Sequence, residues 1–370
     1  MILFLHSRYR TTGGEERAVE DLRWLVRERL GEDAELLGRD SAMLGRAHAA
    51  AGLLHGGLRP DEVARAVRRT RARVVHAHNL NPTLGWRALA AARAAGARVV
   101  LHLHQYRLVC AVGVCFTRGQ ECTRCHGRNT LPGVRLNCRG TGTEAAVYGA
   151  SLALWQRRLV EQVDAFVVPS RFARRRLDEL GAPLAPRPVH VLPHVIRGFA
   201  GAPGAASGGP ALIATRLSPE KGIDVALEAC RSLDLALVIA GEGPERRRLE
   251  AEARADGGEV TFTGRLDGDE LARLRSQAAL ALLPSRAAET FGLAAAEAMA
   301  AGLPVAAARV GALPELIPDG WLAPPGDAAA LAAVIARLRG DANAGAVALA
   351  RVREMTSPEV VATALAEIYR

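Results

Sequence analysis

The chain has 370 residues, of which 49% are hydrophobic, 24% charged and 4% aromatic. This length suggests about two domains, and the many alanines and glycines suit α/β layers better than a β-sandwich. Apolar stretches are interrupted by charge or proline before membrane-spanning length, and Ile2–Leu5 is too short for a signal peptide. We therefore expect a cytoplasmic protein, with peripheral contact at the inner face of the membrane left open.

The charge is unevenly divided along the chain. Residues 1–196 carry 30 Lys and Arg against 17 Asp and Glu, a net of +13, whereas residues 197–370 carry 18 against 22, a net of −4. A basic first half suits an anionic lipid surface or a phosphate-bearing acceptor, and plain solvation of arginines is the alternative. No nucleic-acid-binding motif accompanies the charge, so we expect no nucleic-acid partner.

The first half of the chain alternates between predicted strands and helices. The predicted strands are Ile2–Leu5, Ala34–Leu37, Val74–His76, Arg98–Leu103, Ala165–Val168 and Val189–Leu192, and the predicted helices include Glu15–Leu30, Asp61–Thr70 and Glu144–Val163. This alternation predicts a doubly wound parallel sheet with both faces covered. Ligands of such sheets bind beyond the carboxyl ends of the strands. The residues expected at that edge are Gly13, Gly14, His78 and His104.

An insert at residues 107–142 breaks this alternation and contains five of the six cysteines. Cys122 and Cys125 have the spacing of a zinc knuckle, and two further thiolates would complete a tetrahedral site. Disulfides are not expected in a cytoplasmic chain. Two readings stay open: reduced cysteines packed as small apolar side chains, or a structural zinc ion held by Cys110, Cys122, Cys125 and Cys138.

The second half repeats the strand and helix pattern after a linker at residues 193–210, which is rich in Gly, Ala and Pro. We therefore expect an N-terminal domain of residues 1–195 and a C-terminal domain of residues 196–356. The predicted strands here are Ala211–Thr215, Leu235–Ala240, Val260–Gly264, Ala279–Leu283 and Val305–Ala308. Helices are expected to begin near Ile223, Leu293, Asp327, Asn343 and Pro358.

Two loops of the second half combine charge with the start of a helix. The first contains Arg216 and Lys221, which is the only lysine of the chain, and the second ends at Gly292. The N–H groups and dipole of a helix start favour an anion, and two cations can neutralise a diphosphate without a metal. A glycine at such a start lets a ligand approach the backbone. Ordinary solvated loops are the alternative.

These segments resemble the retaining GT-B glycosyltransferases of family 4, and the resemblance covers nearly the whole chain. It rests on Glu289 followed after seven residues by Glu297, and on the R-L-x-x-x-K-G run that begins at Arg216. The HQYRLVC segment from His104 resembles the HNYRLxC segment of polysaccharide-assembling members, with Gln105 in place of Asn. The resemblance implies two Rossmann-like α/β domains that face each other across a cleft, with residues 357–370 packing back on the N-terminal domain.

The resemblance also implies roles for individual residues. Arg216 and Lys221 would grip the donor diphosphate, Glu289 would hold the donor sugar, and His104 would lie near the reacting carbon; these four form the expected catalytic set. No cofactor is needed for that chemistry. The other substrate-binding residues implied are Gly13, Gly14, Gly241, Gly264, Arg265, Thr290, Phe291, Gly292, Leu293 and Glu297, the last on the nucleotide ribose.

The activity implied is transfer of a sugar from a nucleotide-diphospho-sugar donor to an acceptor hydroxyl, with retention of anomeric configuration. Cell-surface polysaccharide or glycoconjugate assembly is the favoured setting, with a lipid-linked sugar or a small molecule as acceptor. Three alternatives stay open: glycosylation of a small-molecule natural product, a GT-B sugar-nucleotide epimerase or hydrolase, and a non-catalytic sugar-nucleotide-binding subunit.

Overall fold

The computed structural model describes residues 1–8, 13–202, 206 and 208–370. The start of the loop before Gly13 and part of the expected linker at 193–210 lie outside these residues. The chain divides into two compact units, which are described separately. Unit 1 consists of Met1–Thr117, Cys122–Val195 and Pro358–Arg370, and unit 2 consists of Arg118–Glu121 and Ile196–Ser357.

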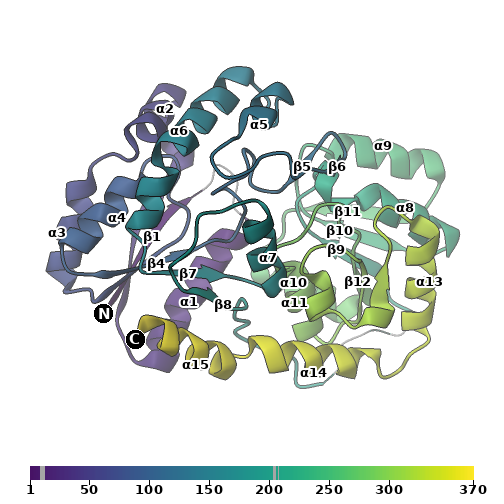
Figure 1. The fold of residues 1–370 in the computed structure, drawn as a ribbon. Helices are drawn as coiled ribbons and strands as arrows, with labels where there is room; N and C mark the ends of the chain where they lie inside the picture. The colour runs from purple at the N-terminus through teal and green to yellow at the C-terminus, as the bar shows by residue number, and fades with distance from the viewer. Residues whose placement is uncertain (9–12, 203–205, 207) are drawn as a thin grey trace. The chain divides into compact units, whose positions relative to one another are not determined.

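Unit 1 is built on a six-stranded parallel sheet of order β2-β1-β3-β4-β7-β8 (Figure 1). Its strands are β1 Ile2–Arg8, β2 Ala34–Asp40, β3 Val74–Ala77, β4 Arg98–His102, β7 Ala165–Val168 and β8 Val189–Val191, with a short β5 at Phe116–Thr117. Its helices are α1 Gly14–Leu30, η1 Ser41–Met43, α2 Arg46–His55, α3 Pro60–Thr70, α4 Gly85–Ala94, α5 Leu131–Arg135, α6 Gly142–Glu161, α7 Arg171–Glu179 and α15 Pro358–Tyr369.

Alternate residues of each strand point to opposite faces of this sheet, and both faces are covered. Leu3 and Leu5 of β1 belong to a core formed with α3, α4, α6 and α7. Ile2 and Phe4 belong to a second core formed with α1 and α15. Burial on both faces is why the central strands are continuous apolar runs. By the same alternation, the histidines of β3 and β4 lie on the face covered by α1 and α15.

Helix α15 belongs to unit 1, although the chain reaches it only after unit 2. Tyr369 is buried, and its hydroxyl lies 2.7 Å from Nδ1 of His76. Arg73 and Arg98 donate to the carbonyls of Tyr369 and Ile368 at 2.8 and 2.7 Å. These arginines satisfy carbonyls of the last turn that have no partner within a helix, and so fix the end of α15.

Unit 2 contains a second six-stranded parallel sheet, of order β11-β10-β9-β12-β13-β14. Its strands are β9 Ala211–Ala214, β10 Leu237–Ala240, β11 Val260–Gly264, β12 Leu280–Leu283, β13 Val305–Ala308 and β14 Leu322–Ala323, and β6 is Gln120–Glu121. Its helices are η2 Pro219–Lys221, α8 Ile223–Ser232, α9 Arg246–Asp256, α10 Gly268–Gln277, α11 Leu293–Ala300, α12 Leu313–Leu316, η3 Asp319–Trp321, α13 Ala328–Arg339 and α14 Ala344–Thr356. Two parallel sheets covered by helices confirm the predicted pair of Rossmann-like domains.

Several helices were not predicted, and α9 shows why. It buries Leu249 and Ala253 and is otherwise mostly polar. Its exposed surface carries ion pairs one turn apart, from Arg246 to Glu250 and from Arg248 to Glu252. Such pairs stabilise a helix without a wide apolar stripe, so the apolar pattern is weak. Among the described residues, no helix combines the length and hydropathy needed to cross a membrane.

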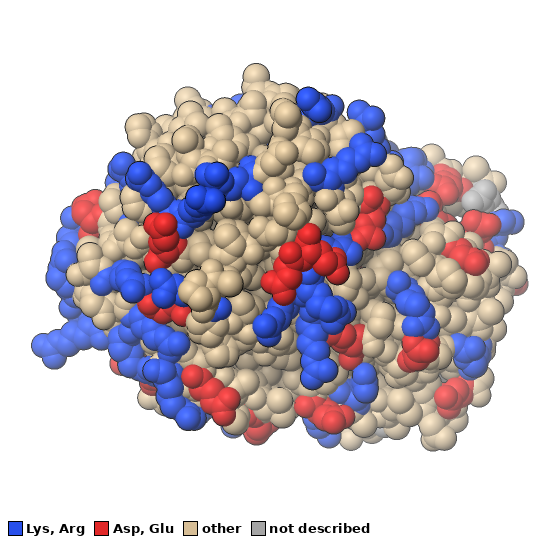
Figure 2. Space-filling model, in the orientation of Figure 1, with Lys and Arg blue, Asp and Glu red and all other residues tan. Residues whose placement is uncertain are grey.

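On the face drawn in Figure 2, the Lys and Arg side chains are dispersed and acidic side chains lie among them. Many are paired: Arg59 contacts Glu62 at 3.0 Å, and Arg139 contacts Glu144 at 3.0 Å. Exposed pairs of this kind contribute roughly 0–1 kcal/mol each. Their placement is what solvated surface arginines are expected to show.

Candidate active site

Lys221 and Glu289 form the central contact at the carboxyl edge of the unit 2 sheet. Nζ of Lys221 lies 2.7 Å from Oε1 of Glu289, and the Ser285 hydroxyl donates to the same oxygen at 2.7 Å. Burial opposes both charges, but the mutual attraction and hydrogen bonds outweigh it. The pKa of Lys221 is therefore raised and that of Glu289 lowered. Both groups are charged at neutral pH.

Two glycines allow the loops that carry this pair to approach each other. Gly222 has φ +62°, and a Cβ atom there would stand 2.2 Å from the carbonyl oxygen of Pro284. Gly311 has φ +60°, and its Cβ would stand 2.3 Å from the carbonyl oxygen of Glu289. Any other residue would meet both backbone strain and overlap. The position of Glu289 thus depends on the loops after three neighbouring strands, β9, β12 and β13.

A second contact fastens the same two loops. Arg286 binds Asp224 through both guanidinium nitrogens, at 2.7 and 2.6 Å, and its backbone N–H donates to the carbonyl of Glu220 at 2.8 Å. Two parallel bonds of this kind fix orientation as well as distance. The loop after β12 is therefore held against the start of α8 independently of the Lys221 pair.

The Gly292 turn leads into α11 beside this pair. Gly292 has φ +95°, and a Cβ there would lie 2.5 Å from Cδ2 of Leu313, so the turn requires glycine. Phe291 is 4% exposed and anchors the turn in the unit 2 core, while Thr290 lies between it and Glu289. Leu293 begins the helix, whose first-turn N–H groups have no partners within the helix. An anion is favoured at such an end.

Arg216 and Glu297 fit their predicted places to different degrees. Arg216 is exposed in the loop after β9, and it lies close enough to Lys221 for its positive charge to act against the raised pKa of the ammonium. Glu297 lies in the second turn of α11, and its carboxylate binds Arg275 of α10 at 2.5 Å. Glu297 was predicted to bind the nucleotide ribose, whereas its pairing with Arg275 was not predicted. A ribose would have to share the carboxylate with Arg275.

The remaining predicted donor residues lie at the carboxyl ends of β10 and β11. Gly241 has φ +149°, and its Cβ would overlap the carbonyl oxygen of Thr215 at 1.9 Å. Its N–H donates to the carbonyl of Gly264 at 2.7 Å, and Arg265 follows as an exposed side chain. Unit 2 therefore brings the predicted donor-binding residues to one sheet edge, although they come from the loops after four strands, β9, β10, β11 and β12.

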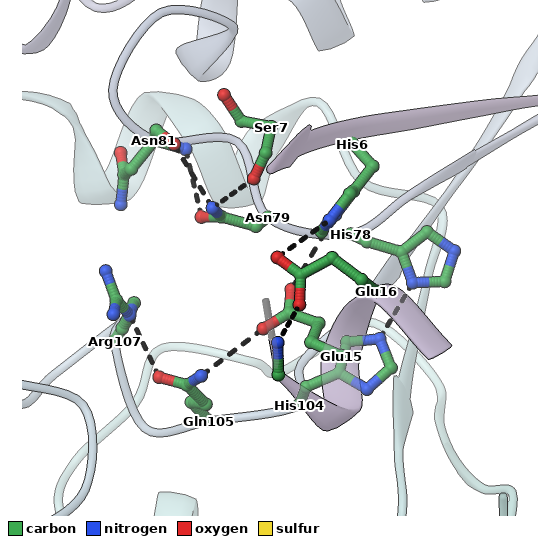
Figure 3. Close-up of polar contacts among 11 residues, drawn as sticks. His6, Ser7, Glu15, Glu16, His78, Asn79, Asn81, His104, Gln105 and Arg107 are labelled. Atoms are coloured by element: carbon green, nitrogen blue, oxygen red, sulfur yellow. Dashed lines mark hydrogen bonds and ion pairs between the residues drawn. The ribbon is translucent and has the colours of Figure 1, made fainter. Parts of the chain in front are cut away.

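The site in unit 1 centres on two histidines that follow neighbouring strands. Nδ1 of His78 lies 2.8 Å from Nε2 of His104, and both side chains are buried (Figure 3). His104 also stacks on His102, with ring centroids 4.0 Å apart, and on His194 at 5.4 Å. His194 enters this stack from the segment after β8.

These imidazoles are neutral at physiological pH. Burial lowers the pKa of His78, His102 and His104 well below the usual value, and lowers that of His76 to about 3 and that of His194 to about 4. His104 is therefore a neutral ring rather than a cation, and it is not charged to act as an acid near neutrality. One of its ring nitrogens pairs with His78 and the other is buried.

Residues from the start of α1 lie at the same edge as His104. Gly13 precedes the helix and its N–H donates to Oε2 of Glu16 at 2.8 Å, while Gly14 is the first helical residue. Gln105 donates from Nε2 to Glu15 at 3.3 Å, and its Oε1 accepts from Arg107 at 2.9 Å (Figure 3). Gln105, which departs from the family pattern, thus ties the loop after β4 to α1.

One group of possible metal ligands occurs among the described residues: His76, His78 and His102, whose ligand atoms lie within 4.8 Å of one another. A metal ion lies in the plane of each imidazole that binds it. These rings are stacked instead, with 8° between the planes of His76 and His102 and 26° between those of His76 and His78. Nearly parallel stacked planes do not meet at one ion, so we assign no metal here.

The cysteines of the insert are all free thiols. Their hydrogen bonds differ from what the four predicted zinc ligands would suggest. A hydrogen bond from Cys115, which lay outside that set, lowers the pKa of Cys110 to about 6. Burial raises the pKa of Cys125, and Sγ of Cys138 donates to the Thr117 hydroxyl at 3.5 Å. In the described chain these thiols do not converge as the three histidines do.

A zinc site made by Cys110, Cys122, Cys125 and Cys138 remains a prediction from sequence. Elemental analysis of protein purified without a histidine tag is expected to find about one zinc per chain if the site exists. Absence of zinc would leave the cysteines as packed thiols. The mechanism proposed below makes no use of this ion.

Comparison with known families fits this geometry. A family model described as a glycosyl transferase 4-like domain matches residues 5–194, half of the chain, and one described as glycosyl transferases group 1 matches residues 211–341. The chain therefore belongs to the GT-B glycosyltransferases of family 4 type. The first matched region lies in unit 1 apart from Arg118–Glu121, and the second lies in unit 2.

Individual relatives agree with the family. The amylovoran biosynthesis glycosyltransferase AmsK of Erwinia amylovora is 40% identical over 156 residues, which are 38% of each chain. Sucrose-phosphate synthase of Thermosynechococcus elongatus shares the fold with a TM-score of 0.72 and 21% identity, covering 100% of this chain and 98% of the other. Anabaena Alr3699/HepE, in complex with UDP-glucose, has a TM-score of 0.66 at 18% identity, covering 100% and 99%.

Proposed function

We propose that this protein transfers a sugar from a nucleotide-diphospho-sugar to an acceptor hydroxyl, with retention of configuration at the anomeric carbon. Unit 2 binds the donor and unit 1 binds the acceptor. The observation that carries the proposal is the 2.7 Å contact between Lys221 and Glu289, beside Arg216 and the Gly292 turn. Two cations, an anion-favouring helix start and a carboxylate are the groups that a sugar diphosphate requires.

In the reaction, the bond from the anomeric carbon to the phosphate oxygen breaks, and a bond to the acceptor oxygen forms. The acceptor proton leaves with the diphosphate or passes to water. Negative charge grows on the departing diphosphate, where we expect Arg216, Lys221 and the N–H groups of α11 to converge. Such preorganised groups stabilise the transition state without reorganising. They can provide this stabilisation without a divalent metal ion.

Glu289 has a different part in this scheme. Both observed hydrogen bonds end on its Oε1, from Lys221 and from Ser285. We expect Oε2 to accept a hydrogen bond from a hydroxyl of the donor sugar. This bond would orient the sugar while Lys221 contacts the diphosphate. His104, neutral and buried, would hydrogen-bond a hydroxyl near the reacting carbon. The carboxylate and the ammonium thus bind neighbouring parts of one ligand.

The comparisons support the donor class and the biological setting without deciding either. HepE binds UDP-glucose, which favours a nucleotide-linked sugar as the donor here. AmsK is an amylovoran biosynthesis glycosyltransferase, which is consistent with the expected role in polysaccharide or glycoconjugate assembly. The match to AmsK covers less than half of either chain, so we do not assign the substrates of AmsK to this protein.

The test is incubation with a panel of radiolabelled sugar nucleotides, with and without lipid-linked and small-molecule acceptors. Glycosylated product that appears only with an acceptor, and keeps the donor's anomeric configuration by NMR, supports the proposal. Free sugar or an epimerised nucleotide without acceptor would instead identify a hydrolase or epimerase. Nucleotide binding without any turnover would identify a non-catalytic subunit.

A further inference from the structure

A cavity within unit 1 joins the buried histidines to an apolar wall. Its polar end includes His78 and His104, which follow β3 and β4. Its other end is lined by Leu53 at the end of α2, Trp86 of α4, and Leu152 and Trp155 of α6. The lining is thus polar where the reaction is proposed to occur and apolar beyond it, as in binding sites for amphipathic ligands.

The apolar wall is held in place by close backbone packing. Gly56 has φ +70°, and a Cβ there would stand 2.2 Å from Nε1 of Trp86. Nε1 of Trp155 donates to the carbonyl of Leu54 at 3.0 Å, and the Ser151 hydroxyl donates to that of Leu53 at 3.0 Å. These contacts tie α6 to the end of α2. The cavity is therefore formed before a ligand arrives.

The two indole rings present little free face for stacking a sugar. Their centroids are 5.9 Å apart, and the Arg158 guanidinium lies over both, 5.4 Å from the Trp86 ring and 5.3 Å from the Trp155 ring. A cation placed this way occupies one face of each ring. The half-buried side chains of Leu53 and Leu152 complete the wall. This wall can therefore bury aliphatic or aromatic carbon atoms of a ligand.

The polar end carries hydrogen-bonding side chains beside the two histidines: Asn79, Gln105 and Arg107 line the cavity there. In the described structure, Nε2 of His78 and Nδ1 of His104 are buried without a hydrogen-bond partner, and so is Nε1 of Trp86 at the other end, so none of these nitrogens meets a ligand unless its ring moves. The amide and guanidinium groups at the histidine end, against the leucines beyond, favour one orientation of the ligand.

We propose that this cavity binds the apolar body of the acceptor, with the acceptor hydroxyl at the polar end lined by His104 and Gln105. The acceptor class assigned is an alcohol or glycoside that carries an alkyl or aryl group, as opposed to a free hydrophilic sugar. The reacting role of this ligand rests on the proposed function. Its binding to unit 1 does not, so the two can be tested separately.

The test compares octyl β-glucoside, below its micelle concentration, with methyl β-glucoside, which has the same sugar hydroxyls. Binding is measured by calorimetry and by tryptophan fluorescence, which reports on Trp86 and Trp155. We expect the octyl compound to bind at least tenfold more tightly. Leu152→Gln is expected to weaken octyl binding at least fivefold. Leu154→Gln, on the same helix but 56% exposed and outside the cavity lining, is the matched control and should bind as the wild type does.

Equal binding of the two glucosides, or equal loss in both leucine variants, would overturn this inference. If circular dichroism shows Leu152→Gln to be unfolded, Leu152→Ala replaces it, with the same expectation. Binding of UDP to each variant is measured in parallel and should not change. A protein that discriminates the glucosides as expected but never transfers sugar would refute the proposed function alone. A transferase that treats both glucosides alike would refute this inference alone.

Discussion

Nζ of Lys221 lies 2.7 Å from Oε1 of Glu289, so the only lysine of the chain is paired with a carboxylate 68 residues away. The pair is one-quarter and one-fifth exposed, at 25% and 19% of the two side chains. It is therefore open enough to meet a ligand, and the attraction between the two groups keeps both charged despite their partial burial. The roles of this pair in catalysis and in stability can be tested separately.

Replacing Lys221 by Ala is expected to lower kcat/KM for transfer at least 100-fold. The ammonium is proposed to meet charge that develops in the transition state, and loss of one such group typically costs about 10²–10³-fold. Glu289→Gln should fall in the same range because it can no longer pair with Lys221 as an anion. Arg309→Ala, which breaks the exposed pair with Asp319 elsewhere in unit 2, is the control and should retain wild-type rates. Full activity of Lys221→Ala would contradict the assignment of Lys221 to the active site.

Because Lys221 and Glu289 interact, the effects of their substitutions on the free energy of unfolding are expected to be non-additive. Either single substitution, Lys221→Ala or Glu289→Ala, leaves a partly buried charge without its partner, which we expect to cost about 1–3 kcal/mol in the free energy of unfolding. The double variant should be less destabilised than the sum of the singles, since neither charge then remains. Urea unfolding of the four proteins measures this coupling. Strict additivity would mean that the two groups do not interact in solution.

The glycine that packs on Glu289 makes a third prediction. Gly311→Ala introduces a Cβ 2.3 Å from the Glu289 carbonyl oxygen at φ +60°, and should cost at least about 1–3 kcal/mol of stability. Because the loop must shift, transfer should also fall by about 100-fold. Gly320→Ala, where a Cβ meets nothing within 4 Å, is the matched control. Equal behaviour of the two variants in melting and activity assays would contradict this account of the loop.

The histidine stack predicts that acid destabilises the protein. His76 has a pKa of about 3 in the folded chain against about 6.5 when unfolded. Between these values only the unfolded chain binds the proton, so stability is complete above pH 6.5 and falls as the pH drops toward 3. The slope is at most about 1.4 kcal/mol per pH unit for each such histidine. His194, with a pKa of about 4, acts in the same direction.

Urea unfolding at pH 7.5 and pH 5.5 measures this dependence. His102→Phe removes one buried imidazole whose ring nitrogens have no hydrogen-bond partner in the described structure, and should reduce the loss at pH 5.5. His48→Gln, an exposed histidine of α2, should leave the dependence unchanged. A wild-type stability that is the same at both pH values would show that the stack is already protonated or solvated.

Much of the fold could be predicted because its strands are short apolar runs buried on both faces, as in β7 and β13, which were placed with correct ends. The helices that escaped prediction have weak patterns. Helix α2 has four alanines and one glycine among its ten residues, and buries only Gly52. Without an apolar stripe, the periodicity of hydrophobic residues does not indicate such a helix. Its position is decided by α6, which lies about 100 residues further along the chain.

The candidate site was predicted where a single loop carries several functional groups, and missed where distant segments meet. The helix start at Gly292 and the loop of Lys221 could be read from glycine and charge placed before a helix. The pairing of Glu297 with Arg275 could not, because it joins two helices. His194 and the indoles of Trp86 and Trp155 were missed for the same reason. Their neighbours come from other strands and helices, and only the fold brings them together.

The central claim is that Lys221 and its surroundings bind a diphosphate. The most direct measurement is calorimetric titration of wild-type and Lys221→Ala protein with UDP and uridine, and with GDP and guanosine, which separates the diphosphate from the base. We predict that the preferred nucleotide binds wild type at least 100-fold more tightly than its nucleoside, and that this ratio falls below about ten in Lys221→Ala. An unchanged ratio in the variant would contradict the account.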